Sequence, residues 1–314
     1  MTYTLALMWR NALAFYTRSF ALWVVLFGVV AYLWPAPFLA LDKHKTLFFS
    51  LTMFGIGAVL RVEDFQRILE SPVIVLIGSA AQFTIMPLGA FLVARWLKLP
   101  DALAVGLILT GSAPGAMASN VMSYIAKADT AYSVSLTTVS TLLCPVLTPG
   151  LTYLLTQGTS LNVSFWAMVL DVMIMVVIPL VAGFAVRHYF REKLERIEPI
   201  FPALSSTFII FICSLIIALN RSRLADVTGL VLAAVLLLNV YGLAAGYGVG
   251  SLFRLGTKRR RTLTIEIGMQ NAGLGATLAL KNLTPETALP AALFVFVCIL
   301  TASALTSLWH RTSA

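Results

Sequence analysis

Long apolar segments recur along the whole chain and are separated by short polar stretches. Each segment is about long enough, as a helix, to cross a ~30 Å hydrocarbon core. The pattern therefore predicts an all-α integral membrane protein with ten transmembrane helices. Their expected ranges are 19–37, 46–61, 72–95, 101–126, 129–155, 163–187, 201–220, 227–253, 261–281 and 287–309.

Glycine, proline and polar residues interrupt two of these segments near their centres. The interruptions cover 111–120 in the expected fourth helix and 266–275 in the ninth. Backbone polar groups need internal partners in lipid, so an unwound segment persists only inside protein or beside a watery cavity. Interrupted helices at matching places in two halves of a chain indicate the binding site of a transporter.

The ten helices divide into two halves of five, at 19–155 and 163–309. An odd number per half inserts the second half in the opposite orientation, which predicts an inverted repeat. Fifteen of the 22 Lys and Arg residues fall on the side of the two termini. The positive-inside rule places that side in the cytoplasm. Residues 1–18 are expected to form an interfacial helix, and 1–314 to form a single transporter unit.

The composition agrees with this topology. The 314 residues are 59% hydrophobic and 11% charged, with a mean hydropathy of +0.91, whereas soluble domains carry about 25% charged residues. The net charge of +9 does not indicate nucleic-acid binding, because the basic residues sit in short loops and form no continuous stripe. The three cysteines lie in apolar segments, without the spacing of a metal site or a disulfide framework.

Oxygen-bearing side chains gather around the two interruptions. Ser133 and Thr137 are four residues apart and therefore share one helix face. One carboxylate with neutral oxygens suits Na⁺, and the lack of a carboxylate cluster disfavours Ca²⁺. The simpler alternative is that these polar groups only pair transmembrane helices. The set comprises Gln82, Ser119, Asn120, Ser133, Thr137, Glu266, Gln270 and Asn271.

Two further features have more than one interpretation. Asp171 is the other carboxylate within an apolar segment. It is a candidate gating or proton-linked residue, or it snorkels into a vestibule or pairs with a Lys or Arg. The basic run 258–261 is interpreted mainly as a topological anchor, with anionic-lipid binding as the alternative.

At these residues the chain resembles the bile acid:sodium symporter family, including its bacterial homologues. The similarity covers nearly the whole chain. Two departures are Met117, where some relatives have threonine, and the apolar stretch 297–299, where some have polar residues. The most specific motifs are Ala81–Pro87, Ala118–Lys127, Ser133–Thr141 with Pro145, and Thr264–Leu274.

The resemblance implies a panel domain and a core domain, with the two broken helices crossing in the core. It also implies two Na⁺ ions and a substrate at the crossing. The first ion would be held by Ser119, Asn120, Ser133, Thr137 and Glu266, and the second by Gln82, Glu266, Ile267, Met269 and Gln270. Ala116, Met117, Ala118 and Asn271 would meet the substrate.

The expected function is sodium-coupled symport of an organic anion, bile-acid-like or a small carboxylate, across the inner (plasma) membrane. The alternative is a proton-coupled or facilitative organic-anion carrier that uses Asp171 or Glu266. An intramembrane enzyme is disfavoured, because the sequence contains neither a nucleophile–base pair nor an aspartate-rich metal motif.

Overall fold

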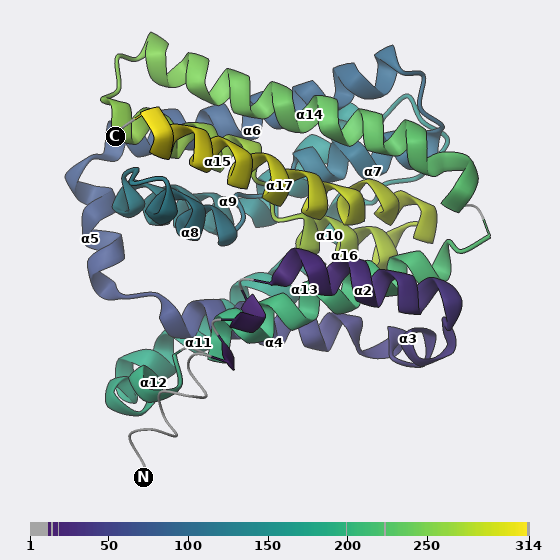
Figure 1. The fold of residues 1–314 in the computed structure, drawn as a ribbon, viewed down its shortest axis with the longest axis horizontal. Helices are drawn as coiled ribbons and strands as arrows, with labels where there is room; N and C mark the ends of the chain where they lie inside the picture. Colours follow the sequence, from purple (N-terminus) through teal and green to yellow (C-terminus); the bar gives the residue numbers. More distant parts are fainter. Residues whose placement is uncertain (1–11, 14, 18, 199, 223, 313–314) are drawn as a thin grey trace. The chain divides into compact units, whose positions relative to one another are not determined.

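The computed structural model describes residues 1–314 except 1–11, 14, 18, 199, 223 and 313–314. Most of the interfacial helix expected over 1–18 therefore lies outside the described residues. Regular secondary structure in the described part is helical, apart from one isolated β-bridge (Figure 1). The helices are α2 Phe20–Leu33, α3 Ala36–Ala40, α4 Lys45–Val59, α5 Val62–Glu70, α6 Pro72–Trp96, α7 Asp101–Gly111, α8 Ala118–Ile125, α9 Thr130–Leu155, α10 Phe165–Val172, α11 Ile178–Tyr189, α12 Arg191–Ile197, α13 Ile200–Leu219, α14 Leu224–Leu252, α15 Thr257–Gly268, α16 Ala272–Asn282 and α17 Leu289–Thr312.

Six of the described helical segments are long and apolar enough to cross a membrane, and a seventh is formed if a pair bent by 72° counts as one span. The all-helical membrane fold is thereby confirmed. The other expected spans correspond to shorter elements, namely α2, α7 with α8, and α15 with α16, so the ten-helix inverted repeat stays a prediction. The six segments are Pro72–Trp96, Thr130–Leu155, Phe165–Tyr189, Ile200–Leu219, Gly229–Leu252 and Pro285–Trp309, and the bent pair joins Asp42–Val59 to Val62–Glu70.

Several prolines lie at the starts of helices or inside them. Pro72 opens α6, and Pro100 is the residue before α7, positions at which the missing N–H costs little. Pro87 lies inside α6 and Pro145 inside α9. Pro179 follows a π-helical turn, η2 Met173–Val177, within the continuous helical segment Phe165–Tyr189.

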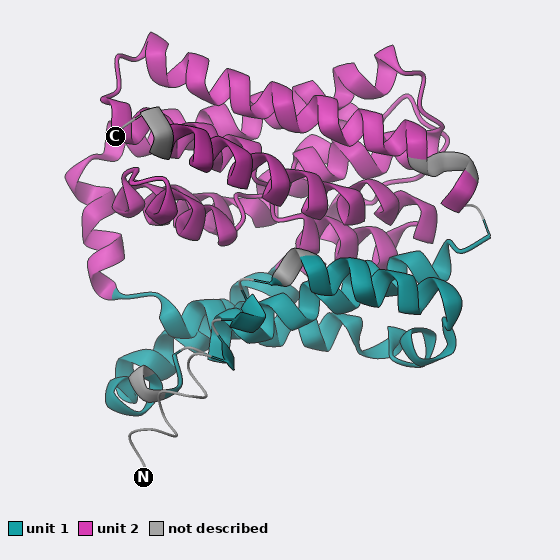
Figure 2. Ribbon diagram, in the orientation of Figure 1, with its two compact units in different colours: residues 1–61, 173–222 teal, residues 62–172, 223–314 magenta. Residues whose placement is uncertain are grey.

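The chain forms two compact units (Figure 2). Unit 1 comprises residues 1–61 and 173–222. Within it, α4 and α11 approach so closely that a Cβ atom at Gly57 would collide with the Leu180 carbonyl. Small residues at such contacts let helix backbones pack tightly in membranes. The buried Arg187 donates to the Ala58 carbonyl at 2.9 Å, which satisfies an acceptor in the last turn of α4.

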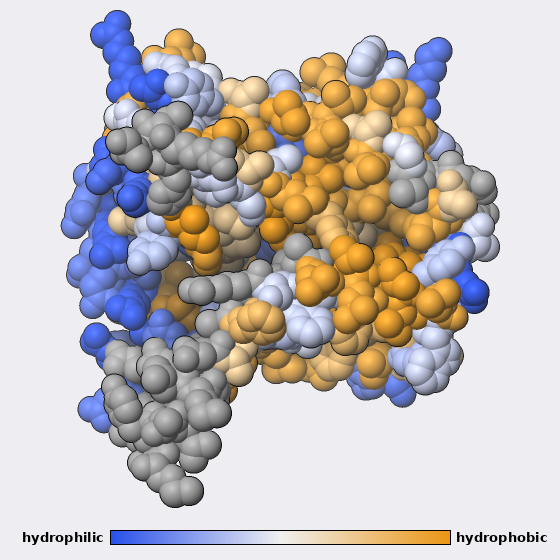
Figure 3. All heavy atoms as spheres, viewed as in Figure 1, coloured by the Kyte–Doolittle hydropathy of each residue, from blue (hydrophilic) through white to orange (hydrophobic). Residues whose placement is uncertain are grey.

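Unit 2 comprises residues 62–172 and 223–314. In it α14 packs against α6, α15 and α17, and α9 packs against α6, α8 and α15. Apolar side chains cover much of the visible face over α14 (Figure 3). Leu236 and Val240 are among the exposed apolar residues of this helix. An exposed apolar surface of this kind is typical of helices that face lipid. Every candidate site residue named above belongs to unit 2.

Candidate functional site

The two helix interruptions lie against each other as a short antiparallel pair. The first separates α7 from α8, and the second separates α15 from α16. The Ala116 N–H donates to the Met269 carbonyl at 2.9 Å, and the Asn271 N–H donates to the Pro114 carbonyl at 2.7 Å. Each interruption therefore supplies partners for backbone groups that the other has freed, as burial in an apolar medium requires.

A glycine is required at the centre of this contact. Gly115 forms the β-bridge with Gln270, and a Cβ atom at position 115 would collide with Oε1 of Glu266. The Gly115 N–H donates to the hydroxyl of Ser140 on α9 at 3.3 Å. The absent side chain thus lets the backbone pass directly beside the buried carboxylate.

Glu266 is the centre of a buried cluster of oxygen atoms. It is 2% exposed. Its Oε2 accepts from the hydroxyls of Ser119 at 2.5 Å and Ser133 at 3.0 Å, while its Oε1 accepts from the Thr137 hydroxyl at 2.5 Å. The Thr137 hydroxyl also lies 3.3 Å from Oδ1 of Asn120. Residues from α8, α9 and α15 therefore converge on one carboxylate.

The residues expected to hold a second ion form a neighbouring network. The Gln82 side-chain amide donates to Oε1 of Gln270 at 2.7 Å, and the Gln270 amide donates to the Ile267 carbonyl at 3.2 Å. The Met269 carbonyl, also expected in this site, accepts the hydrogen bond from the Ala116 N–H of the first interruption. Oε1 of Gln82 is buried without a hydrogen-bond partner in the described part of the chain. An unpaired buried acceptor is costly, and a cation would satisfy it.

Helices α8 and α16 both begin at the crossing. Asn271 caps α16, because its Oδ1 accepts from the Leu274 N–H at 3.1 Å. Ala116, Met117 and Ala118 lead into α8, and Met117 gives that helix no side-chain cap. Two helix N-termini at one place, one of them without a side-chain acceptor, suit an anionic group.

Three residues outside the expected set hold the interruptions in place. On α9, the Thr148 hydroxyl donates to the Ser112 carbonyl at 2.7 Å, in addition to the contact of Ser140 with Gly115. On α14, the Asn239 amide donates to the Gly268 carbonyl at 2.8 Å. In the sequence each of them is only a polar residue in an apolar helix. That signal does not distinguish a residue that positions an interruption from one that simply pairs two helices.

Asp171 lies in an ion pair. Its Oδ1 is 2.5 Å from Nζ of Lys281, and its Oδ2 accepts from the Asn282 amide at 2.8 Å. Both partners come from the C-terminal end of α16. Of the alternatives raised by the sequence, pairing with a lysine is the one present; a gating role stays a prediction.

The basic run at the start of α15 makes specific contacts inside unit 2. Nε of Arg259 lies 3.2 Å from Oδ2 of Asp129. The Arg260 and Arg261 guanidinium groups lie over the rings of Tyr247 and Trp309, at 5.3 Å from each centroid. These contacts stabilise helix packing; a role of the run in topology stays a prediction.

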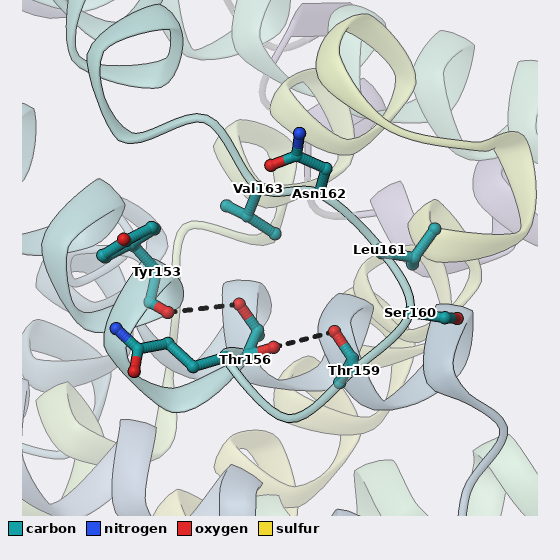
Figure 4. A pocket seen from close by; sticks show the side chains of 8 residues that line it. Tyr153, Thr156, Thr159, Ser160, Leu161, Asn162 and Val163 are labelled. Atoms are coloured by element: carbon teal, nitrogen blue, oxygen red, sulfur yellow. Dashed lines mark hydrogen bonds between the residues drawn. The ribbon is translucent and has the colours of Figure 1, made fainter.

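A shallow hollow of about 500 Å³ lies at the C-terminal end of α9 (Figure 4). In the segment where α9 ends, the Thr156 hydroxyl points to the Tyr153 carbonyl and the Thr159 hydroxyl points to the Thr156 carbonyl. Tyr153 is sixteen residues beyond Thr137 on α9, which places it about 24 Å away at ~1.5 Å per residue. The hollow is therefore separate from the Glu266 cluster.

A buried carboxylate at the contact of two interrupted helices, in a multi-pass membrane protein, is typical of a membrane transporter. Residues 46–227, more than half of the chain, match the Sodium Bile acid symporter family. The chain belongs to this family of sodium-dependent solute cotransporters.

Relatives share similarity along most of this chain. The uncharacterized sodium-dependent transporter YocS of Bacillus subtilis is 37% identical over 302 residues, covering 96% of this chain and 94% of the relative. The probable sodium/metabolite cotransporter BASS1, chloroplastic, of Arabidopsis thaliana is 31% identical over 95% of this chain and 74% of its own length. The rice protein BASS2, with the same description, is 35% identical over 94% of this chain and 71% of its own length.

Proposed function

We propose that this protein is a symporter that uses the Na⁺ gradient to import a small organic anion across the inner (plasma) membrane by alternating access. The observation that carries the proposal is the Glu266 cluster, in which one carboxylate meets three hydroxyls at the crossing of two interrupted helices. The substrate class includes small carboxylates and bile-acid-like anions. The relatives described as sodium/metabolite cotransporters support this range.

Ser119, Asn120, Ser133, Thr137 and Glu266 form the first Na⁺ site in this proposal. Neutral oxygens with a single carboxylate are ligands suited to a monovalent hard cation. The observed separations of 2.5–3.3 Å between these groups support the assignment, because they gather the oxygens of five side chains around one place. The ion would also compensate a charge that is costly to bury alone.

The second Na⁺ site uses Gln82, Gln270, Glu266 and the carbonyls of Ile267 and Met269. The unpartnered Oε1 of Gln82 supports it. No direct hydrogen bond joins Glu266 to either glutamine among the described residues; the link runs through the adjoining backbone. Two ions offset one buried carboxylate and one monoanion, so import of two Na⁺ per monoanion would carry one net positive charge.

The substrate anion lies at the crossing, near the residues 116–118 and Asn271. The N-termini of α8 and α16 support this placement, because their partial positive charge favours an anion. Sodium binding orders the two interruptions around Glu266, and the anion then completes the site. Binding of ions and substrate is coupled because both use the same antiparallel backbone contact.

The architecture in this proposal consists of ten spans in two inverted repeats, 19–155 and 163–309, with both termini cytoplasmic. Unit 1 corresponds to the panel domain and unit 2 to the core domain. The location of every candidate site residue in unit 2 supports that correspondence. Alternating access then requires motion of the core relative to the panel.

Uptake into proteoliposomes tests the proposal. A set of labelled small carboxylates and bile-acid-like anions is offered with an inward Na⁺ gradient or an equal K⁺ gradient. We expect accumulation of at least one anion only with Na⁺, and loss of that accumulation in Glu266→Gln. Equal uptake in Na⁺-free medium, or uptake driven by a proton gradient alone, would overturn sodium coupling in favour of the other carrier mechanism.

A further inference from the structure

Helices α9 and α15 contact each other at two places along their length. The two places are four residues, or about one helical turn, apart on each helix. At the level nearest the cation site, Ser133 and Thr137 of α9 bind Glu266 of α15. Asp129 precedes Ser133 by four residues, and Thr262 precedes Glu266 by four. These two residues also bind each other, so the helices share a second level of contact one turn before the cation ligands.

The contact between Asp129 and Thr262 uses backbone groups on one side and a single hydroxyl on the other. The Asp129 N–H donates to Oγ1 of Thr262 at 2.9 Å, and the Thr262 hydroxyl lies 2.9 Å from the Asp129 carbonyl. Thr262 is fully buried. Oδ1 of Asp129 accepts from the Tyr132 N–H, so the same residue also caps α9.

Arg259 adds an ion pair to this arrangement. Its Nε lies 3.2 Å from Oδ2 of Asp129, but the two side chains are 39% and 27% exposed. A pair this open to solvent contributes little by itself. The hydroxyl of Thr262 is the larger contributor, because it is fully buried. Removing it leaves the part-buried N–H of Asp129 with the more distant Lys258 carbonyl, at 3.4 Å, in place of an acceptor at 2.9 Å.

We propose that Thr262 and Asp129 are positioning residues that set the Na⁺ affinity of the Glu266 site. This inference rests on the proposed function. The Asp129–Thr262 contact fixes how far α9 and α15 are displaced along each other. The separation between the two hydroxyls of Ser133 and Thr137 and the Glu266 carboxylate depends on that displacement. A cation needs its ligands at defined distances, so a small shift between the helices weakens Na⁺ binding.

The same helix offers a matched control for Thr262. Thr264 is also buried, at 3% exposure, and its hydroxyl donates to the Arg260 carbonyl four residues earlier at 2.8 Å. Thr262 likewise lies near the Lys258 carbonyl, at 3.2 Å. Of the two threonines, only Thr262 also has described hydrogen bonds to Asp129, the residue that caps α9. A valine at either position keeps the shape and removes the hydroxyl.

The test measures the NaCl concentration that gives half of the maximal thermal stabilisation of the purified protein, at constant ionic strength with KCl. We expect Thr262→Val to raise this concentration about three- to tenfold, the effect of one lost buried hydrogen bond. Thr264→Val should change it less than about twofold, and Thr262→Ser should restore the wild-type value. The melting temperature in KCl alone is recorded separately, because a purely structural role would lower it without moving the Na⁺ concentration.

A Thr262→Val protein with the wild-type Na⁺ dependence would overturn the inference while leaving sodium coupling intact. If the wild-type protein itself is not stabilised by NaCl relative to KCl, the proposed function fails first, and the inference fails with it. If Thr262→Val cannot be purified in folded form, Thr262→Ala decides, with Thr264→Ala as its control. A rise in the required Na⁺ concentration in Thr262→Ala alone supports the contact, whereas a wild-type value, or an equal rise in both variants, overturns it.

Discussion

Oγ1 of Thr137 lies 2.5 Å from Oε1 of Glu266, although 129 positions separate the two residues along the chain. The contact joins α9 to α15 within unit 2. We expect Thr137→Val to weaken Na⁺ binding by about tenfold or more, because it removes a proposed ion ligand, and a polar contact with a charged group contributes roughly 1.5–3 kcal/mol. A sodium titration of thermal stability measures the change.

Thr141→Val is the control for this variant. Thr141 lies one turn further along α9, and its hydroxyl donates to the Thr137 carbonyl at 2.7 Å. Its removal leaves the Glu266 carboxylate with its three donors. Equal effects of the two substitutions would argue against direct involvement of Thr137 in the cation site.

Glu266→Gln separates ion binding from folding. We expect Na⁺ to lose its stabilising effect, since both proposed sites share this carboxylate. We also expect the melting temperature in KCl to rise, because the substitution removes a buried charge that no cation compensates in that medium. A stabilisation by Na⁺ equal to that of the wild type would contradict the assignment of Glu266.

Gly115→Ala should impair the site through sterics alone. The added methyl group would collide with Oε1 of Glu266, so the carboxylate or the crossing backbone must move. We expect loss of most Na⁺-dependent uptake. Gly248→Ala is the control. Gly248 lies exposed in α14, and the added carbon would meet no atom within 4 Å beyond its own helix backbone and chain neighbours, so the stability of the protein should rise by about 0.5–1 kcal/mol. Matching losses of uptake would point to a general effect of alanine.

The pair between Asp171 and Lys281 is testable by a double-mutant cycle. The side chains are 12% and 36% exposed, so we expect a coupling of roughly 1 kcal/mol or less. Asp171→Asn and Lys281→Gln should each lower the melting temperature, and the double variant should lose less than the sum. The Na⁺ concentration for half stabilisation should stay unchanged, because Lys281 lies ten residues beyond Asn271 on α16, about 15 Å along that helix. A change in uptake rate at saturating Na⁺ would support gating by Asp171, and an additive cycle would contradict the pairing.

The sequence predicted the helices well where a local property determines them. The segment 129–155 was expected as a helix, and α9 spans Thr130–Leu155. The interruptions were also visible, because glycine and proline weaken helices by their own backbone properties. The bend between α4 and α5 was not anticipated: the expected helix ended at residue 61, and α5 continues after it as a helix rich in charged residues.

The sequence named polar residues that the structure brings together around Glu266, but not how they contact one another. Glu266 attracted attention because a carboxylate in an apolar segment is costly without a partner. Arg259 was interpreted mainly as a topological anchor, and the structure gives it Asp129 as a partner. Thr262 carried no signal, since a buried threonine commonly bonds to its own helix.

By itself the sequence determined the apolar helices, the two places where helices are interrupted and the polar residues that accompany them. These follow from hydropathy, chain length and backbone conformational preference, which act over a few neighbouring residues. Only the tertiary structure decided that Ala116 meets Met269, that Thr137 meets Glu266 and that Thr262 meets Asp129. Such pairings join positions more than a hundred residues apart, and they depend on how whole helices pack and are displaced along one another, which no local pattern encodes.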